Sequence, residues 1–272
     1  MAVLNLEQIE RHLETSFIGR VSGCPNELWD SIDSTNTRAA QLAATMPAEG
    51  AIVMAREQTA GRGRLGRTWI SRPDTGVYMS IILRPQTRPL NELSLLTMAC
   101  GVAVAEAIDA VAGVSIGLKW VNDLIFDGRK IGGILAETTG RAPAYVIIGI
   151  GLNVALDLST VEDDLKERVD SLDRIAGAEI DSNQLVCAIA EKLEQHYKSL
   201  LQSQDEVILN QWRKRTVTLG QRVIATSGAR NISGVAYDVN SSGALIIQCD
   251  DGHEEAVNAG EVQIRRHDGA YC

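Results

Sequence analysis

A run of arginines and glycines, residues 61–69, is the part of the sequence best suited to binding an anion. It reads G-R-G-R-L-G-R-T-W and places three guanidinium groups within six residues, at Arg62, Arg64 and Arg67. Like charges about 7 Å apart in water repel by about 0.6 kcal/mol per pair, so the loop gains more from enclosing an anion than from ordering itself. Arginine makes bidentate bonds to phosphate and carboxylate, and the Trp69 indole offers a flat face to a purine. The segment therefore predicts a nucleotide-phosphate clamp that closes on its ligand.

The same letters match two other phosphate-binding patterns, which we reject. They fit the dinucleotide pattern G-x-G-x-x-G and, with Arg67 in place of lysine, a near-miss of the P-loop. Both patterns need a helix that starts at the last glycine, so that its N-terminus meets the phosphates. Residues 69–73, W-I-S-R-P, are not a helix start. The non-functional alternative is a solvated basic turn with Trp69 as an ordinary core residue.

Short apolar runs joined by tight turns predict a sheet around this loop. We expect strands at 27–29, 51–57, 77–83, 114–120, 124–126, 130–137 and 145–154, with Asp127-Gly128 as a hairpin turn. Helical periodicity predicts helices at 4–13, near 38–43, at 91–111 and at 183–201. Successive strands with tight turns favour a mixed, largely antiparallel sheet with helices segregated to one side.

The pattern changes at Thr216 to short strands separated by glycine turns, at 222–226, 232–239, 244–248 and 262–265. Such a pattern suits a small β-barrel. We therefore predict an α+β fold with two domains, 1–215 and 216–272.

Composition excludes several classes of function. The net charge of −9 argues against a surface that binds nucleic acid by phosphate neutralisation. Five widely spaced cysteines without a C-x-x-C pair suit reduced thiols in the cytoplasm, and the four histidines have no ligand spacing, so we expect no metal site built by the protein. A signal peptide and a continuous membrane-length apolar run are not evident, so we expect no membrane partner.

The 61–69 loop resembles the G-R-G-R-x-G-R-x-W signature of the biotin protein ligases. Ser34-Thr35-Asn36 is similar to the S-T-N triplet of that family, Gln58 to its glutamine, and residues 119–123, K-W-V-N-D, to its K-W-[PV]-N-D motif. Residues 129–137, R-K-I-G-G-I-L-A-E, and 149–154, G-I-G-L-N-V, complete the set in the expected order. The resemblance implies a class II synthetase-like catalytic domain in residues 1–215 and an SH3-like domain in residues 216–272.

The activity implied by the resemblance is that of an ATP-dependent ligase. Such an enzyme forms biotinyl-5'-AMP from biotin and ATP with Mg²⁺, then transfers biotin to a lysine of a biotin carboxyl carrier protein, of the acetyl-CoA carboxylase type. The residues implied for catalysis are Lys130, Arg62, Asp123 and Lys119. Those implied for biotin binding are Ser34, Thr35, Asn36, Gln58, Arg62, Gly63, Arg64, Lys130, Gly133, Gly149 and Gly151. Those implied for ATP binding are Arg64, Arg67, Trp69, Asn122, Lys130 and Asn153.

Some of these residues have ordinary structural explanations as well. At pH 7 only about four in ten thousand acceptor lysines are neutral, since the pKa is near 10.4, so a base such as Asp123 would help the transfer. Asp123 could equally be a turn aspartate, and Ser34 a helix cap. Gly132, Gly133, Gly149 and Gly151 lie in predicted strands, where glycine indicates close backbone approach, a bulge or close packing of the sheet against a helix.

Three other functions compete with this interpretation. A lipoate or octanoate protein ligase would share the sheet and the lysine, but the complete arginine loop favours biotin. A ligand-sensing DNA-binding regulator is opposed by the charge, and by the thirty or so residues before the first motif, which leave no winged helix-turn-helix. A biotin-binding module without catalysis is weakened because Lys119, Asp123 and Lys130 are all present. The oligomeric state, monomer or homodimer, stays open.

Overall fold

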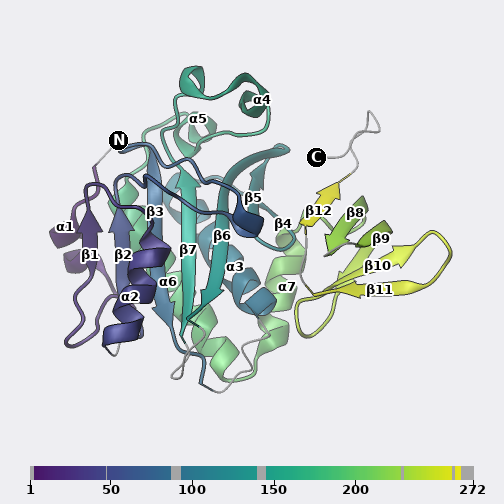
Figure 1. The fold of residues 1–272 in the computed structure, drawn as a ribbon, viewed down its shortest axis with the longest axis horizontal. Helices are drawn as coiled ribbons and strands as arrows, with labels where there is room; N and C mark the ends of the chain where they lie inside the picture. The colour runs from purple at the N-terminus through teal and green to yellow at the C-terminus, as the bar shows by residue number, and fades with distance from the viewer. Residues whose placement is uncertain are drawn as a thin grey trace.

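The computed structural model of the chain describes residues 3–46, 48–86, 93–139, 145–227, 230–258 and 261–264. Its larger part is a seven-stranded sheet in the order β1-β2-β3-β7-β6-β5-β4 (Figure 1). The strands are β1 (Glu27–Trp29), β2 (Ile52–Ala55), β3 (Gly76–Leu83), β4 (Gly117–Lys119), β5 (Asp123–Phe126), β6 (Arg129–Thr138) and β7 (Val146–Asn153). β1 pairs with β2 in parallel and the other neighbours are antiparallel. The predicted mixed, largely antiparallel sheet is confirmed.

Helices cover both faces of this sheet. α3 (Leu93–Ala112) and α6 (Ser182–Leu201) pack on one face together with α1 (Leu6–His12) and α7 (Asp205–Arg215), while α2 (Thr35–Thr45) packs on the other (Figure 1). The alternation of side chains along β3 shows this division, because Ile81 joins the core with α3, and Ile82 joins a second cluster with Ala39 and Leu42 of α2. The expectation that all helices lie on one side is therefore wrong for α2.

α3 is the helix at the centre of the core. It is 20 residues long with a mean hydropathy of 1.8, so by length and composition alone it could cross a membrane. Its most apolar window is 72% buried by the sheet and by α6 and α7, as expected for the core helix of a globular domain.

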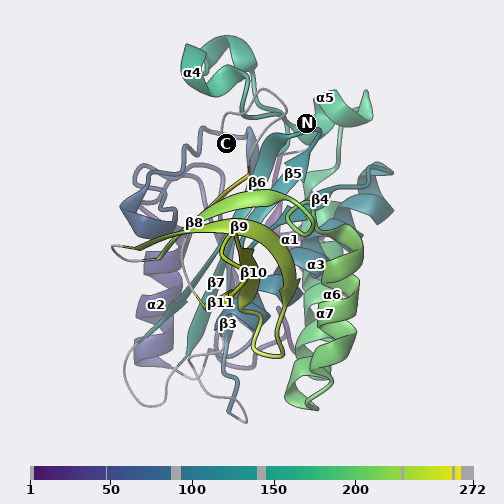
Figure 2. The same cartoon turned by 90° about the vertical axis from the view of Figure 1, so that its right-hand side faces the viewer.

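A five-stranded antiparallel sheet forms the small second unit, in the order β11-β10-β9-β8-β12. Its strands β8, β9, β10 and β11 face the viewer in Figure 2. Its strands are β8 (Arg222–Ser227), β9 (Arg230–Val239), β10 (Leu245–Cys249), β11 (Glu254–Val257) and β12 (Glu261–Ile264). The expected end of the last strand, residue 265, lies outside the described residues, as do Cys272 and His267. Trp120 attaches this unit to the larger one, since its backbone N–H donates to Thr218 Oγ1 at 2.8 Å and its indole N–H to the Gly243 carbonyl at 3.0 Å.

Three α-helices and one strand were not predicted. They are the short helices α4 (Asp163–Lys166) and α5 (Leu172–Ala176), the helix α7, and the strand β11. The predicted hairpin between β5 and β6 is confirmed, with positive φ at Asp127 and Gly128. The helix expected at 91–111 is α3, although residues 91 and 92 lie outside the described part of the chain.

Candidate active site

A pocket opens on the α2 face of the large sheet, and glycines of β7 form its floor. Along β7, Ile148, Ile150 and Leu152 belong to the core on the α3 side, so Gly149 and Gly151 face the opposite side. A Cβ atom at Gly149 would collide with the Asn36 amide, and one at Gly151 would lie 2.6 Å from the Trp69 indole nitrogen. At Gly149 the absent side chain lets helix α2 pack close to the sheet, which fits the alternative of close packing against a helix, whereas at Gly151 it makes room for Trp69 of the loop.

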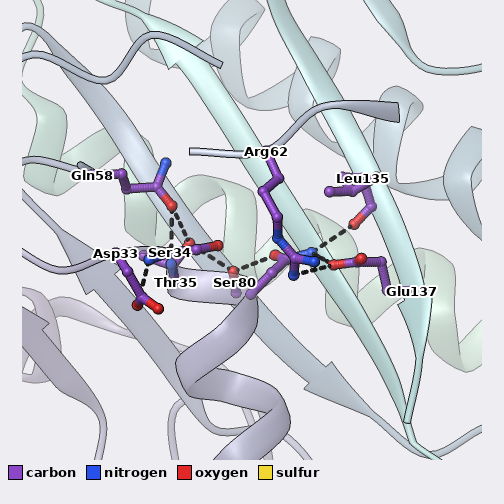
Figure 3. Close-up of polar contacts among 9 residues, drawn as sticks. Asp33, Ser34, Thr35, Gln58, Arg62, Ser80, Leu135 and Glu137 are labelled. Atoms are coloured by element: carbon purple, nitrogen blue, oxygen red, sulfur yellow. Dashed lines mark hydrogen bonds and ion pairs between the residues drawn. The ribbon is translucent and has the colours of Figure 1, made fainter. Parts of the chain in front are cut away.

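The N-terminus of α2 supplies a polar wall of the pocket (Figure 3). Thr35 donates to Gln58 Oε1 from its backbone N–H at 2.9 Å and from its hydroxyl at 3.1 Å. Gln58 is fixed from its other end, because its amide donates to Ser71 Oγ at 2.8 Å. Ser34 occupies the N-cap position, yet its side chain makes no capping hydrogen bond, which weakens the explanation of Ser34 as an ordinary cap.

Ser80 and Glu137 hold the Asn36 side chain over the sheet. Ser80, which is completely buried, donates to Asn36 Oδ1 at 2.6 Å and lies 2.8 Å from Thr35 Oγ1. The Asn36 amide nitrogen donates to Glu137 Oε2 at 2.7 Å, and the same oxygen accepts from the Arg62 guanidinium at 2.9 Å (Figure 3). Helix α2, strands β3 and β6 and the arginine loop thus meet in one network.

The arginine loop forms a tight extended turn over the pocket. The Gly63 N–H donates to the Arg67 carbonyl at 2.7 Å, and the Trp69 N–H donates to the Gly61 carbonyl at 2.9 Å. A single 3-10 turn, Arg64–Gly66, lies between them, and extended backbone follows. The rejection of the dinucleotide and P-loop patterns is therefore confirmed, because both require an α-helix at this point.

Lys130 and Asp123 form an ion pair on one wall of the pocket. Lys130 Nζ lies 2.5 Å from Asp123 Oδ1, and about a third of the Lys130 side chain is exposed. A register shift between β5 and β6 places Asp123 opposite Gly133, where a Cβ atom would lie only 3.3 Å from Lys130 Cε. Gly133 therefore leaves space for the lysine stem. Arg64 reaches the same wall and donates to Asn122 Oδ1 at 3.0 Å.

Trp69 lies between the loop and the sheet, with one face beside Gly151. Lys130 Nζ is 5.5 Å from the centre of its ring. The indole nitrogen is buried without a hydrogen-bond partner among the described residues. Because a buried N–H usually finds an acceptor, this donor is well placed to serve a bound ligand.

Nearly all the predicted site residues come together in this pocket. Its lining includes Ser34, Thr35, Asn36, Gln58, Arg62, Gly63, Arg64, Arg67, Trp69, Lys119, Asn122, Asp123, Lys130, Gly133, Gly149 and Gly151. Asn153 is not among the lining residues, and its amide donates to the Asp170 carbonyl at 3.1 Å. Asn153 thereby holds Asp170 in place. The Asp170 N–H in turn donates to the Lys130 carbonyl at 3.1 Å, so Asn153 supports the strand that carries Lys130. Gly132 lies against Leu152 and Leu124 in the sheet, which fits the alternative of close packing.

Some residues that line the pocket or support its walls were not predicted from the sequence. Val262 of β12 lines the pocket, although it is more than a hundred residues from the predicted motifs. Ser80 is an isolated serine in an apolar strand, and Glu137 ends a predicted motif without a role assigned to it. Tyr78 of β3 pairs with Gly151 of β7, and burial raises its pKa to about 12, so it stays neutral. Only the folded sheet brings these side chains together.

A second group of polar side chains lies away from the pocket, on the β10–β11 hairpin. Possible metal-ligating atoms of Cys249, Asp251 and His253 lie within 4.8 Å of one another. The spacing of the histidines along the sequence did not indicate this group. The His253 ring already contacts Asp251 through Nδ1. Burial and the neighbouring carboxylates raise the pKa of the Cys249 thiol, which stabilises its protonated form.

Comparison with known proteins gives consistent matches. Residues 28–153 match the biotin/lipoate A/B protein ligase family, and residues 218–265 match the biotin protein ligase C terminal domain. The chain is 31% identical over 264 residues to a biotin–acetyl-CoA-carboxylase ligase of Mycobacterium tuberculosis, covering 93% of this chain and 94% of that protein. It is 34% identical over 232 residues to the bifunctional ligase/repressor BirA of Bacillus subtilis, covering 85% of this chain and 71% of the relative.

A solved structure agrees with these sequence matches. The biotin protein ligase of Aquifex aeolicus in complex with biotin and ATP superposes with a TM-score of 0.77 at 27% identity, covering 89% of this chain and 99% of that one. The match extends over both sheets of the fold. From the two domain matches, the relatives that align over most of their length and the shared architecture, we conclude that this chain belongs to the biotin protein ligase family.

Proposed function

We propose that the pocket joins biotin and ATP as biotinyl-5'-AMP and then passes biotin to a lysine of a carrier protein. The chain is a ligase by its family, and relatives named for biotin ligation cover nearly its whole length. The observation that carries the assignment to this pocket is the position of Arg62, Arg64 and Lys130, whose cations line one pocket from the loop and from β6.

The first step joins two anions. A carboxylate oxygen of biotin attacks the α-phosphorus of ATP, the new O–P bond forms, and pyrophosphate leaves. Cations fixed where negative charge develops stabilise such a transition state strongly. Lys130 is suited to lie between the carboxylate and the phosphate, with Arg62 and Arg64 on the loop side. Arg67 and Trp69 are suited to the nucleotide, and Lys119 adds positive charge at the edge of the pocket.

The opposite end of the pocket suits the biotin ring. A ureido ring has two N–H donors and one carbonyl acceptor on an apolar frame, so it needs a few fixed polar groups in an otherwise apolar slot. Ser34, Thr35, Asn36 and Gln58 provide such groups, and Gly149 leaves the floor flat beneath them.

The second step transfers the acyl group. The neutral amine of the acceptor lysine attacks the acyl carbon, an amide bond forms, AMP leaves, and one proton is released. Asp123 is the carboxylate in the pocket that could take this proton. Its contact with Lys130 holds it at the point where the adenylate would lie.

Mg²⁺ is expected to accompany ATP, and the donor set of the pocket suits it. Magnesium prefers carboxylate and amide oxygens together with substrate phosphates. Asp123 and Asn122 carry such oxygens, and both now accept from cationic side chains, Lys130 and Arg64. When bound, the ion would screen the charge of the phosphates.

We also propose the domain boundaries, the acceptor protein and the cellular compartment. We assign residues 1–215 to the catalytic domain and 216–272 to the C-terminal domain. The expected acceptor is the biotin carboxyl carrier of an acetyl-CoA carboxylase, and the expected compartment is the cytoplasm. Size-exclusion chromatography with light scattering would distinguish a monomer from a homodimer.

A mass measurement tests the proposed function directly. The protein is incubated with biotin, MgATP and a biotin-carrier domain, and the carrier should gain the mass of one biotinyl group on one lysine. Parallel reactions with lipoate separate biotin ligation from the related lipoate ligation. The proposal would be contradicted if the carrier were modified in the lipoate reaction but not in the biotin reaction, or if it were modified in neither.

A further inference from the structure

Glu137 accepts hydrogen bonds from two pocket residues through one oxygen. Its Oε2 atom is 2.7 Å from the amide nitrogen of Asn36 and 2.9 Å from the guanidinium of Arg62 (Figure 3). Asn36 is buried at the start of α2, and Arg62 belongs to the loop. Glu137 on β6 therefore connects the loop to the helix across the sheet.

This contact decides which way the Asn36 amide points. The two ends of an amide have nearly the same shape, so its orientation follows from its hydrogen-bond partners. A carboxylate only accepts, so the amide nitrogen must face Glu137. The amide oxygen then faces the Ser80 hydroxyl at 2.6 Å and lies over Gly149 on the pocket floor. At this position the pocket wall therefore carries a hydrogen-bond acceptor, the Asn36 amide oxygen.

We propose that Glu137 is a positioning residue that fixes the polarity of the Asn36 amide and anchors Arg62, and so sets the affinity for biotin more than that for ATP. The inference rests on the proposed function, because the ligand whose ring offers two N–H donors is biotin. A pocket that presents an acceptor to such donors binds them, whereas a reversed amide would place two donors together.

Substituting Glu137→Gln tests this role, because glutamine has the same shape but only one oxygen. In one orientation the glutamine oxygen takes the place of Oε2 and accepts from both Asn36 and Arg62, but without the negative charge; in the other orientation the new NH2 group faces both donors. Hydrogen bonds to charged groups are among the stronger ones, so we expect the KM for biotin in pyrophosphate exchange to rise about tenfold. The KM for ATP should stay within about twofold.

Glu27→Gln is the matched control. Glu27 also accepts from two partners, the guanidinium of Arg38 at 2.7 and 2.8 Å and the Trp29 indole at 2.8 Å, but it does not line the pocket. This variant should keep the KM for biotin of the wild type. An equal rise of that KM in both variants would show that loss of any such ion pair loosens the fold, and would overturn the inference.

A double variant separates positioning from simple structural support. In Asn36→Asp alone, two carboxylates face each other, and biotin binding should weaken. Combined with Glu137→Gln, the new NH2 group at the Oε2 position can donate to the new carboxylate, and the repulsion between two carboxylates is removed. The double variant should therefore bind biotin at least tenfold more tightly than Asn36→Asp alone.

The measurements distinguish a failure of the proposed function from a failure of the positioning role of Glu137. Absence of pyrophosphate exchange in the wild type would contradict the proposed function itself. Exchange in the wild type together with an unchanged KM for biotin in Glu137→Gln, or a double variant no better than Asn36→Asp, would reject the positioning role of Glu137 alone. Melting temperatures of all variants show whether each one folds.

Discussion

The Lys130 ammonium and the Asp123 carboxylate lie 2.5 Å apart, on neighbouring strands at the wall of the pocket. The two residues are proposed for different steps, Lys130 for adenylate formation and Asp123 for transfer. Each is the counter-ion of the other, so substitution of either one should reveal which step depends on it.

Lys130→Ala should greatly slow adenylation while the fold survives. Loss of one preorganised cation from the transition state costs about 3 to 4 kcal/mol, so pyrophosphate exchange should fall by two to three orders of magnitude. Lys166→Ala is the control, because Lys166 pairs with Asp163 on the exposed helix α4. A folded Lys130→Ala that exchanges pyrophosphate at the original rate would refute the assigned role.

Asp123→Asn should slow the transfer step. The variant is given pre-formed biotinyl-adenylate and a carrier domain, so that the first step is bypassed. Without a carboxylate to accept the proton, transfer should fall by a factor of about 10² or more, the usual contribution of a general base. Transfer at the wild-type rate would clear Asp123 of this role and favour the explanation of a structural aspartate.

The arginine loop should become protected from protease when its ligands bind. Arg62 and Arg67 are exposed in the structure, so trypsin should cut the free protein between residues 62 and 67. Biotin with ATP should slow this cut because the guanidinium groups then bind anions. Cutting after Lys166 serves as the reference, and an equal rate with and without ligands would count against closure.

Gly151→Ala should weaken ATP binding. The added Cβ would lie 2.6 Å from the Trp69 indole nitrogen, so the indole must move away from the floor of the pocket. We expect the KM for ATP to rise by about tenfold, since stacking on an aromatic side chain contributes about 1 to 3 kcal/mol per base. Gly101→Ala on α3 is the control, because its Cβ would meet Leu118 at an ordinary 3.5 Å. An unchanged KM for ATP would mean that the indole does not hold the nucleotide.

Stability should depend on pH through Glu194. Burial raises the pKa of this carboxyl, but hydrogen bonds from Lys198 and from the backbone of residues 16–18 outweigh burial and lower it to about 2, from an ordinary 4.5. A lowered pKa stabilises the fold above pH 4.5, and this stabilisation is lost as the pH falls towards 2.

Glu194→Gln should therefore reduce the free energy of unfolding near pH 7 by on the order of 3 kcal/mol. The difference from the wild type should shrink between pH 4.5 and 2, as measured by urea unfolding. Glu7→Gln is the control, since its pair with Arg11 is largely exposed and contributes little. A constant difference over that range would exclude the titration of Glu194 as its cause.

The sequence predicted the large sheet well because its strands carry β-branched runs and its turns carry clear signals. Asp127-Gly128 both adopt the positive φ that such a hairpin requires. α7 was missed because its buried residues, Ile208, Leu209 and Trp212, span less than two turns in an otherwise polar segment. β11 was missed because it is only four residues long and begins with two glutamates, Glu254 and Glu255. Which face of the sheet α2 covers depends on long-range packing, which periodicity alone does not contain.

The pocket was predictable where chemistry is concentrated in short motifs, and unpredictable where it depends on register. The arginines, Lys130 and Asp123 stand out by type and spacing. Ser80 of β3 reaches the pocket residue Asn36 because it lies opposite Gly149 of β7, and that pairing follows from the register of two strands about seventy residues apart.

Val262 of the last strand lines a pocket built otherwise by the large sheet and its loop. A ligand in that pocket therefore touches both units of the fold and binds fully only when both are folded. By mass action it should stabilise them jointly. In calorimetric melting with saturating biotin and ATP, the small unit should melt together with the large one.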